Sequence, residues 1–202
     1  MNTQDTYLTL KGYSEGFYKE KGSKFLAFAF VIKSEEDAKE KLKELKKKYF
    51  DARHHCYAYI LGVRGEKFRA NDDGEPGHSA GDPILGQIRS YGLTNTLIVV
   101  VRYFGGTKLG ISGLINAYKT TASDAIANNS VVENLIYSEL SIQFDYPQLN
   151  QAMKIVKDFD LKILSQNMEL SCSMTLGVRL SFEEAVKSRI KDIHEIKIDT
   201  NT

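Results

Sequence analysis

The segment RANDDGEPGHSAGDPIL, from Arg69 to Leu85, concentrates residue types that can do chemistry: carboxylates, a histidine, a serine, glycines and prolines. Gly77 to Gly81 matches the G-x-S-x-G pattern, in which the serine, here Ser79, is the nucleophile of a hydrolase. That nucleophile requires a strand immediately before it and a histidine later in the chain. Here a loop sequence, NDDGEP, precedes it, and the only later histidine is His194. The match alone therefore does not favour hydrolase chemistry.

A metal site is the second chemistry that these residues suggest. Its candidate ligands are His54, His55, Cys56, Asp72, Asp73, Glu75 and His78. His54 and His55 lie in an expected strand, where neighbouring side chains point to opposite faces, so at most one of them can join the loop. The carboxylates also lack the spacing of an EF-hand loop, and Asp72 and Asp73 equally suit turns, where they accept backbone N–H groups. We predict neither a metal nor an organic cofactor.

A second glycine-rich segment, GGTKLGIS, follows the apolar run Thr96–Gly106 and precedes an expected helix. It is not a P-loop, because no lysine and serine or threonine directly follow its last glycine, Gly110. Glycines at the start of a helix nevertheless expose backbone N–H groups, and a helix N-terminus favours an anion. Arg102 and Lys108 would add positive charge. The segment therefore suits a phosphate contact, or its glycines only permit a tight turn.

Three strands are predicted around these segments. Gly22–Ser34 alternates between apolar and other residues, which predicts a strand with one buried face formed by Phe28, Phe30 and Ile32. His54–Gly62 is rich in β-forming residues. Five successive aliphatic residues within Thr96–Gly106 predict a central strand covered on both faces.

Three helices accompany the strands. The first begins at Ser34, with Asp37 in the capping-box position, and its apolar stripe comprises Ala38, Leu42, Leu45 and Tyr49. Its other face is lysine-rich, which indicates a solvated surface or one that follows phosphates. The second spans Ala80–Tyr91, with Pro83 in its first turn. The third carries Leu114, Tyr118, Thr121 and Ala125 on one side.

The C-terminal part is predicted to be a separate small domain, with the junction in Asn128–Asn134. Its apolar periodicity gives the order β-α-β-β-α-β, the ferredoxin-like arrangement. Strict alternation from Met168 to Leu180 hides the turn between the two middle strands. Ser181 to Glu184 is a capping box for the last helix. We therefore predict an α+β protein with domains at residues 1–134 and 135–202.

Bulk properties exclude several classes of protein. The chain has 202 residues and a net charge of +1, so nucleic-acid binding would require a local basic patch. No apolar run approaches the roughly 18 residues of a membrane helix, and the polar N-terminus is unlike a signal peptide. Two widely separated cysteines suit a reducing compartment. We expect a cytoplasmic protein with no membrane partner.

Five motifs together resemble the bacterial YigZ branch of the IMPACT family: KGSKFLA, HHCYAY, NDDGEP…AGDPIL, VVVRYFGGTKLG and GLINAY. The resemblance implies a first domain similar to the second domain of a small-subunit ribosomal protein. It implies a ferredoxin-like C-terminal domain similar to one in elongation factor G. Eukaryotic members of this family regulate translation. The family often has Ser-Gly-Thr where this chain has Gly77-His78-Ser79, so His78 is not expected to be a general family catalyst.

The leading hypothesis is a protein that binds RNA, the ribosome or translation factors, with little or no catalytic activity. Two glycine-rich loops would line a cleft whose binding residues are Asp72, Asp73, Glu75, Arg102, Tyr103, Gly105, Gly106 and Lys108. Arg102, Lys108 and backbone N–H groups would contact phosphate, Tyr103 or Phe104 would stack a base, and the carboxylates would pair with the basic groups. One alternative is a hydrolase that acts on a phosphorylated small molecule or nucleotide in this cleft, with Ser79 as its hydroxyl. Another is an interaction scaffold.

Overall fold

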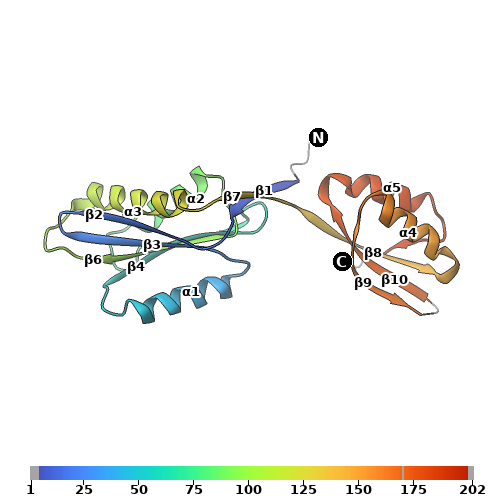
Figure 1. The fold of residues 1–202 in the computed structure, drawn as a ribbon, viewed down its shortest axis with the longest axis horizontal. Helices are drawn as coiled ribbons and strands as arrows, with labels where there is room; N and C mark the ends of the chain where they lie inside the picture. Colours follow the sequence, from blue (N-terminus) through green and yellow to red (C-terminus); the bar gives the residue numbers. More distant parts are fainter. Residues whose placement is uncertain (1–4, 170, 200–202) are drawn as a thin grey trace. The chain divides into compact units, whose positions relative to one another are not determined.

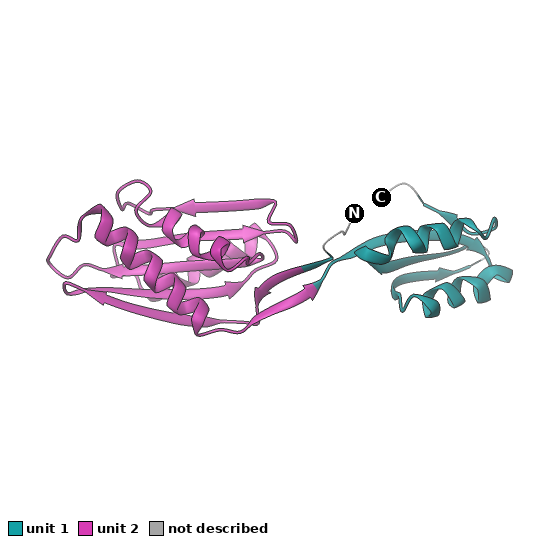
Figure 2. Cartoon of the chain, turned by 90° about the horizontal axis from the view of Figure 1, so that it is seen from above, with its two compact units in different colours: residues 1–6, 135–202 teal, residues 7–134 magenta. Residues whose placement is uncertain are grey.

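The structure is a computed structural model that describes residues 5–169 and 171–199, and it divides into two compact units (Figure 2). The N-terminal unit is Tyr7–Asn134. The C-terminal unit begins at Leu135 and also includes Asp5 and Thr6. Asp5 belongs there because its carbonyl accepts a hydrogen bond from the Ile136 N–H at 2.7 Å. Its carboxylate pairs with Arg179 at 2.5 Å.

The N-terminal unit is built on a five-stranded sheet with the order β2-β3-β6-β4-β5 and antiparallel neighbours. Its strands are β2 (Ser14–Glu20), β3 (Ser23–Val31), β4 (His54–Leu61), β5 (Lys67–Asn71) and β6 (Thr96–Tyr103). Its helices are α1 (Glu35–Lys48), α2 (Gly81–Ser90) and α3 (Gly110–Ala127). Helix α1 covers one face of the sheet, and α2 and α3 cover the other (Figure 1). Two further strands, β1 (Thr6–Leu10) and β7 (Val131–Leu135), pair in a separate ribbon.

The central strand β6 and its neighbour β3 are buried on both faces. This confirms the prediction for β6, in which Leu97–Val101 are fully covered. The prediction of one buried face for β3 is wrong. Phe28 packs on the α1 side, whereas Phe25 and Ala27 pack against the α2 and α3 side. The second face is lined partly by alanines, which give a weak hydrophobic signal although they allow helices to pack closely.

Local signals define helix α1 as predicted. The Ser34 hydroxyl accepts a hydrogen bond from the Asp37 N–H at 3.0 Å, and the Asp37 carboxylate accepts one from the Ser34 N–H at 3.2 Å. This reciprocal pair is a capping box. Strands β1, β2, β5 and β7 were not predicted. Three of them, β1, β5 and β7, are only five residues long, and β2 is an edge strand of mostly polar sequence.

The C-terminal unit has the predicted β-α-β-β-α-β order in a four-stranded sheet, β11-β8-β10-β9. Its elements are β8 (Tyr137–Asp145), α4 (Leu149–Asp158), β9 (Lys162–Met168), β10 (Ser171–Arg179), α5 (Glu183–Lys191) and β11 (Lys197–Ile198). The core lies between the sheet and the two helices. The hidden turn falls between Met168 and Ser171. The chain is therefore an α+β protein.

The predicted capping box of the last helix is wrong. A short 3₁₀ turn, Leu180–Phe182, precedes α5, and no side chain caps the helix. The Ser181 hydroxyl instead hydrogen-bonds to Asp5. In the part of the chain that the structure describes, no helix is long and apolar enough to cross a membrane.

Gly105 and Gly106 provide a matched pair for testing the loop after β6. A Cβ atom on Gly105 would lie 1.9 Å from the carbonyl carbon of Gly22, whereas one on Gly106 would meet open space. Gly106 has φ of +89°. We expect Gly105→Ala to destabilise the N-terminal unit by about 3 kcal/mol, because the backbone must shift. Gly106→Ala should cost only about 1 kcal/mol, for the left-handed conformation. Urea unfolding followed by circular dichroism measures both, and equal effects would contradict this account.

Candidate nucleic-acid interface

The predicted binding residues all lie at one end of the five-stranded sheet, which we call the loop end. Strand β6 finishes there with Arg102 and Tyr103, which pair with His54 of β4 and Lys24 of β3 respectively. The β2–β3 turn, the segment after α1, the loop of residues 72–80 and the loop of residues 104–109 therefore meet at this end. Figure 1 shows the end of α1 and the connection from β6 to α3 in this region.

Asp72 holds the start of helix α2. Its Oδ1 accepts hydrogen bonds from the Ala80 and Gly81 N–H groups at 2.9 and 2.8 Å, and its Oδ2 accepts one from the His78 N–H at 2.9 Å. Burial by itself would raise the pKa of Asp72, but the three backbone donors outweigh it, so this pKa lies below its ordinary value. The carboxylate is occupied within the protein and is not free to bind a ligand.

Asp72→Ala is expected to destabilise the N-terminal unit by about 1–2 kcal/mol, as for other lost helix caps. Because the folded-state pKa is lowered, this stabilisation is complete above the ordinary aspartate pKa of about 4. It is lost as the pH falls through the lower folded-state value. The difference in unfolding free energy between wild type and variant should therefore shrink in acid. A difference that does not change down to about pH 2 would contradict the assignment.

Asp73 joins three elements at the loop end. Its Oδ2 accepts a hydrogen bond from the His55 N–H at 2.7 Å, and its Oδ1 pairs with Lys46 of α1 at 3.1 Å. The Asp73 carbonyl lies 2.9 Å from Nδ1 of His54. Since a carbonyl can only accept, this contact makes Nδ1 the protonated nitrogen of that ring. His54 lies on the Arg102 face of the sheet and His55 on the opposite face, as strand alternation requires.

Glu75 and Arg102 form a buried ion pair. Arg102 Nη1 lies 2.5 Å from Glu75 Oε1, and their side chains are only 7% and 4% exposed. Tyr118 of α3 donates to the same carboxylate oxygen at 2.8 Å and accepts from the Cys56 thiol at 3.3 Å. Burial raises the pKa values of both Tyr118 and Cys56. This network ties the loop of residues 72–80 to β6, β4 and α3.

The predicted phosphate contact of Arg102 does not fit this geometry, since the guanidinium is buried and paired. It instead lies between two rings, 5.5 Å from the Phe25 centroid and 5.6 Å from that of Phe104. Phe104 is 50% exposed. The buried Arg102 guanidinium therefore makes a cation–π contact with the ring of Phe104 and helps to hold that ring in place.

Tyr103 points to the other face of the sheet, toward α1, because it neighbours Arg102 on a strand. Its hydroxyl donates to Asp51 at 2.7 Å. Burial, followed by this hydrogen bond, raises the pKa of Tyr103 to about 12. The contact anchors the segment between α1 and β4 to the end of β6. Of the two predicted stacking residues, Phe104 has the more exposed ring.

Ser79 does not fit the role of a catalytic hydroxyl. It is fully buried, and its Oγ donates to the Pro76 carbonyl at 2.6 Å. The neighbouring His78 points into solvent and pairs with Asp82 at 2.6 Å. Within residues 5–169 and 171–199, no three histidine, cysteine, aspartate or glutamate side chains are grouped to hold a metal ion.

The loop of residues 104–109 is largely exposed and leads into α3. Gly105 packs against the β2–β3 turn, and its N–H donates to the Ser23 hydroxyl at 3.1 Å. Gly106 and Gly110 have positive φ, and no side chain caps α3. Lys108 is exposed.

Six exposed cationic side chains surround the loop end, and we call them the basic cluster: Lys21, Lys24, Lys47, Lys48, Arg53 and Lys108. None of them forms an ion pair with another described residue. Among the nearby acidic residues, Asp73 and Glu75 pair with the cations Lys46 and Arg102. Asp51 and Glu20 accept hydrogen bonds from the Tyr103 and Tyr18 hydroxyls and keep their charge, so they are two anions against six cations. The cluster is therefore a local excess of positive charge on a chain whose net charge is +1.

Four members of this region were missed by the sequence analysis: Lys21, Lys24, Arg53 and the exposed Phe50. They come from two segments that are far from the glycine-rich loop in sequence. Only the pairing of β3 and β4 with β6 brings them together. The one local signal was the Lys21-Gly22 pair, which is typical of a turn and would place Lys21 on the surface.

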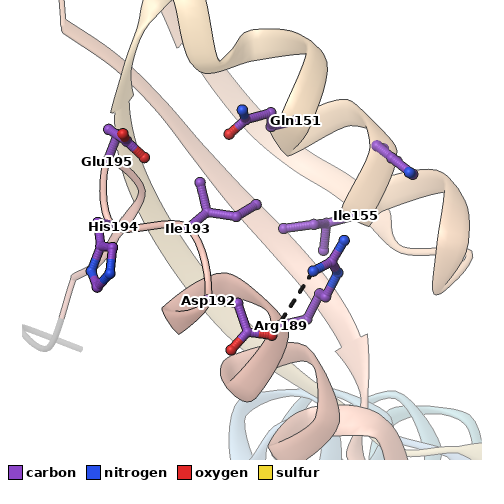
Figure 3. Close-up of a pocket in the computed structure, with 8 residues that line it drawn as sticks. Gln151, Ile155, Arg189, Asp192, Ile193, His194 and Glu195 are labelled. Atoms are coloured by element: carbon purple, nitrogen blue, oxygen red, sulfur yellow. Dashed lines mark ion pairs between the residues drawn. The ribbon is translucent and has the colours of Figure 1, made fainter.

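A separate hollow of about 330 Å³ lies in the C-terminal unit, between α4 and the end of α5 (Figure 3). Ile155 and Ile193 form part of its lining. Its charged residues carry both signs: Lys154, Arg189, Asp192 and Glu195. Arg189 lies 3.9 Å from Asp192. Such a balanced lining does not select a polyanion.

Comparison with known proteins assigns the chain to a family. The Impact N-terminal domain model matches residues 21–126, which include the loop end. IMPACT family member YvyE of Bacillus subtilis is 34% identical over 168 residues, covering 81% of this chain and 77% of that protein. IMPACT family member YigZ of Escherichia coli is 31% identical over 151 residues, 74% of each protein. A crystal structure described as a hypothetical protein superposes with a TM-score of 0.75 and 25% identity, covering 96% of this chain and 97% of that one. The chain belongs to the IMPACT family.

Proposed function

We propose that this protein binds RNA through the basic cluster and acts in the regulation of translation, in the cytoplasm and without catalysis. The observation that carries the proposal is the concentration of six unpaired cations at one end of a nearly neutral chain. Lysine and arginine side chains that contact phosphates supply most of the affinity in nucleic-acid binding. Membership of the IMPACT family supports the ribosome or its RNA as the target, because the resemblance to that family implies a link to the regulation of translation.

The loop after β6 supplies further phosphate contacts in this proposal. Helix α3 begins at Gly110 without a side-chain cap, so its first N–H groups are available to an anion. Gly106 and Lys108 precede it in the exposed loop. The buried residues Glu75 and Arg102 do not contact the RNA in this proposal. Their ion pair fixes the loops that carry the contacts.

A salt-dependent titration tests the proposal. Labelled RNA oligonucleotides, transfer RNA and purified ribosomes are titrated with the full chain between about 50 and 300 mM KCl. We expect the logarithm of the association constant to fall linearly with the logarithm of salt concentration. For single-stranded oligonucleotides the slope should be no steeper than about −4, the value for six contacts to a single strand. No binding to any of these RNAs, or binding that salt does not weaken, would overturn the proposal.

A further inference from the structure

Two phenylalanine rings project from the loop end into solvent. Phe50 is 83% exposed and Phe104 is 50% exposed. Apolar surface left in water is unfavourable, and burying it against a ligand is favourable. Both rings therefore provide apolar surface to whatever binds there.

The backbones that carry these rings are held in place. The Asp51 carboxylate, one residue after Phe50, accepts the Tyr103 hydroxyl, and the Ala52 N–H donates to the Tyr49 carbonyl at 3.0 Å. Phe104 stacks over Arg102, whose guanidinium is fixed by Glu75. A phenylalanine on an anchored backbone has only two side-chain torsions to restrict when a ligand stacks on its ring, so stacking costs little entropy.

The rings lie on opposite sides of the end of β6. Phe50 belongs to the segment anchored by Tyr103 on the α1 side, and Phe104 stacks on Arg102 on the α3 side. Cations flank both: Lys47, Lys48 and Arg53 near Phe50 in the chain, and Lys108 near Phe104. This is the combination of stacking platforms and positive charge that binds unpaired nucleotides.

Paired nucleic acid would not use these rings. In a duplex the bases are stacked inside and only the phosphates and groove edges face the protein, so lysines alone would suffice. An apolar protein partner would favour a continuous patch without charge at its centre. Here two separate rings stand among cations.

We propose that the ligand of the basic cluster is single-stranded RNA, whose unpaired bases stack on Phe104 and on Phe50 while the intervening phosphates contact the lysines. This inference rests on the proposed RNA binding and adds the strandedness and the stacking residues. The strand crosses the end of β6 from the α3 side to the α1 side.

The absence of tryptophan from the chain makes a direct test available. Phe104→Trp and Phe50→Trp each introduce one indole, whose fluorescence is quenched when a base stacks on it. The control is Phe68→Trp: Phe68 is 58% exposed and lies at the opposite end of the sheet, where β5 pairs with Ile60. The probes are an oligouridylate of about 12 nucleotides and its duplex with oligoadenylate.

We expect the single strand to quench the indoles at positions 104 and 50 but not at 68. Phe104→Ala and Phe50→Ala should each weaken single-strand binding by about 5- to 100-fold. Duplex binding should be weaker and should not change in these alanine variants. Phe104→Leu, which keeps apolar bulk over Arg102, separates lost stacking from a disturbed loop and should weaken binding as alanine does.

The outcomes distinguish this inference from the proposed function. Equal binding of single strand and duplex, with no effect of the phenylalanine variants, would overturn the inference and leave RNA binding by the cations intact. Failure to bind either nucleic acid would overturn both. Quenching at position 104 by a ribosomal protein but not by RNA would also overturn the inference, in favour of a protein partner.

Discussion

Replacing Glu75 with alanine is expected to destabilise the N-terminal unit by about 3–5 kcal/mol, because it leaves the charge of Arg102 buried without a partner. Arg102 is 6% exposed and cannot turn into solvent without leaving the contact with Phe25. Tyr118 loses its acceptor at the same time. A cost of this size is a large fraction of the stability of an ordinary domain.

Two further variants separate charge from shape. Glu75→Gln keeps an acceptor for Tyr118 but removes the negative charge, so its cost should be intermediate. The double variant Glu75→Leu with Arg102→Met replaces the ion pair by apolar groups of similar volume. It should recover most of the loss, since such replacements of buried ion pairs are often neutral.

Hydrogen–deuterium exchange of the full chain measures these costs for each unit. Peptides of β6 and α3 should lose protection in Glu75→Ala, while peptides of β8 and β10 in the C-terminal unit serve as the internal control. A loss below about 1 kcal/mol in Glu75→Ala would mean that the pair is more solvated than its burial indicates.

The parts of this molecule that sequence could predict are those with local signals. Helix α1 has its capping box and apolar stripe within sixteen residues, from Ser34 to Tyr49. Strand β6 contains five successive aliphatic residues, and these are buried on both sides. In each case the period and the boundary residues lie in one stretch of chain, so no tertiary information was needed.

The role of Arg102 could not be predicted in this way. Alternation along β6 does indicate that Arg102 and Tyr103 face opposite layers. It does not reveal that Glu75, 27 residues earlier, is buried beside Arg102 and neutralises it. A charged residue next to a glycine-rich loop therefore suggested a ligand contact, whereas its partner is internal. The same applies to Asp72, whose three hydrogen-bond donors come from the turn that follows it and from the start of α2.

The basic cluster is formed by the pairing of β3 and β4 with β6, and no single segment of the sequence contains it. Lys21 comes from the β2–β3 turn, Lys24 from the start of β3, Lys47 from the end of α1, and Lys108 from the loop after β6. The composition of the whole chain, with 27 cationic and 26 acidic side chains, conceals this arrangement. Lys46 and Arg102 compensate the charges of Asp73 and Glu75, so of these nearby carboxylates only Asp51 and Glu20, which accept neutral tyrosine hydroxyls, offset the six cations.

Removing four charges of the cluster should therefore abolish most RNA binding without loss of stability. In the variant Lys21→Ala, Lys24→Ala, Lys47→Ala and Lys108→Ala, the slope of the salt dependence should fall by about 3. The affinity at about 0.15 M salt should fall by roughly 100-fold, because the variant makes fewer phosphate contacts and therefore releases fewer counterions on binding. All four side chains are exposed and without ion pairs among the described residues, so the unfolding free energy should change by less than about 0.5 kcal/mol for each substitution.

A matched control variant isolates the position of the charges from their number. Four exposed lysines elsewhere, Lys11, Lys67, Lys119 and Lys157, are replaced by alanine. Both variants change the net charge from +1 to −3, since four positive charges are lost from +1. If RNA binding depends on the cluster, the control should retain nearly the wild-type affinity and slope, because its charges lie outside the loop end. Equal losses in the two variants would show that only the overall charge matters, and the loop end would then not be the interface.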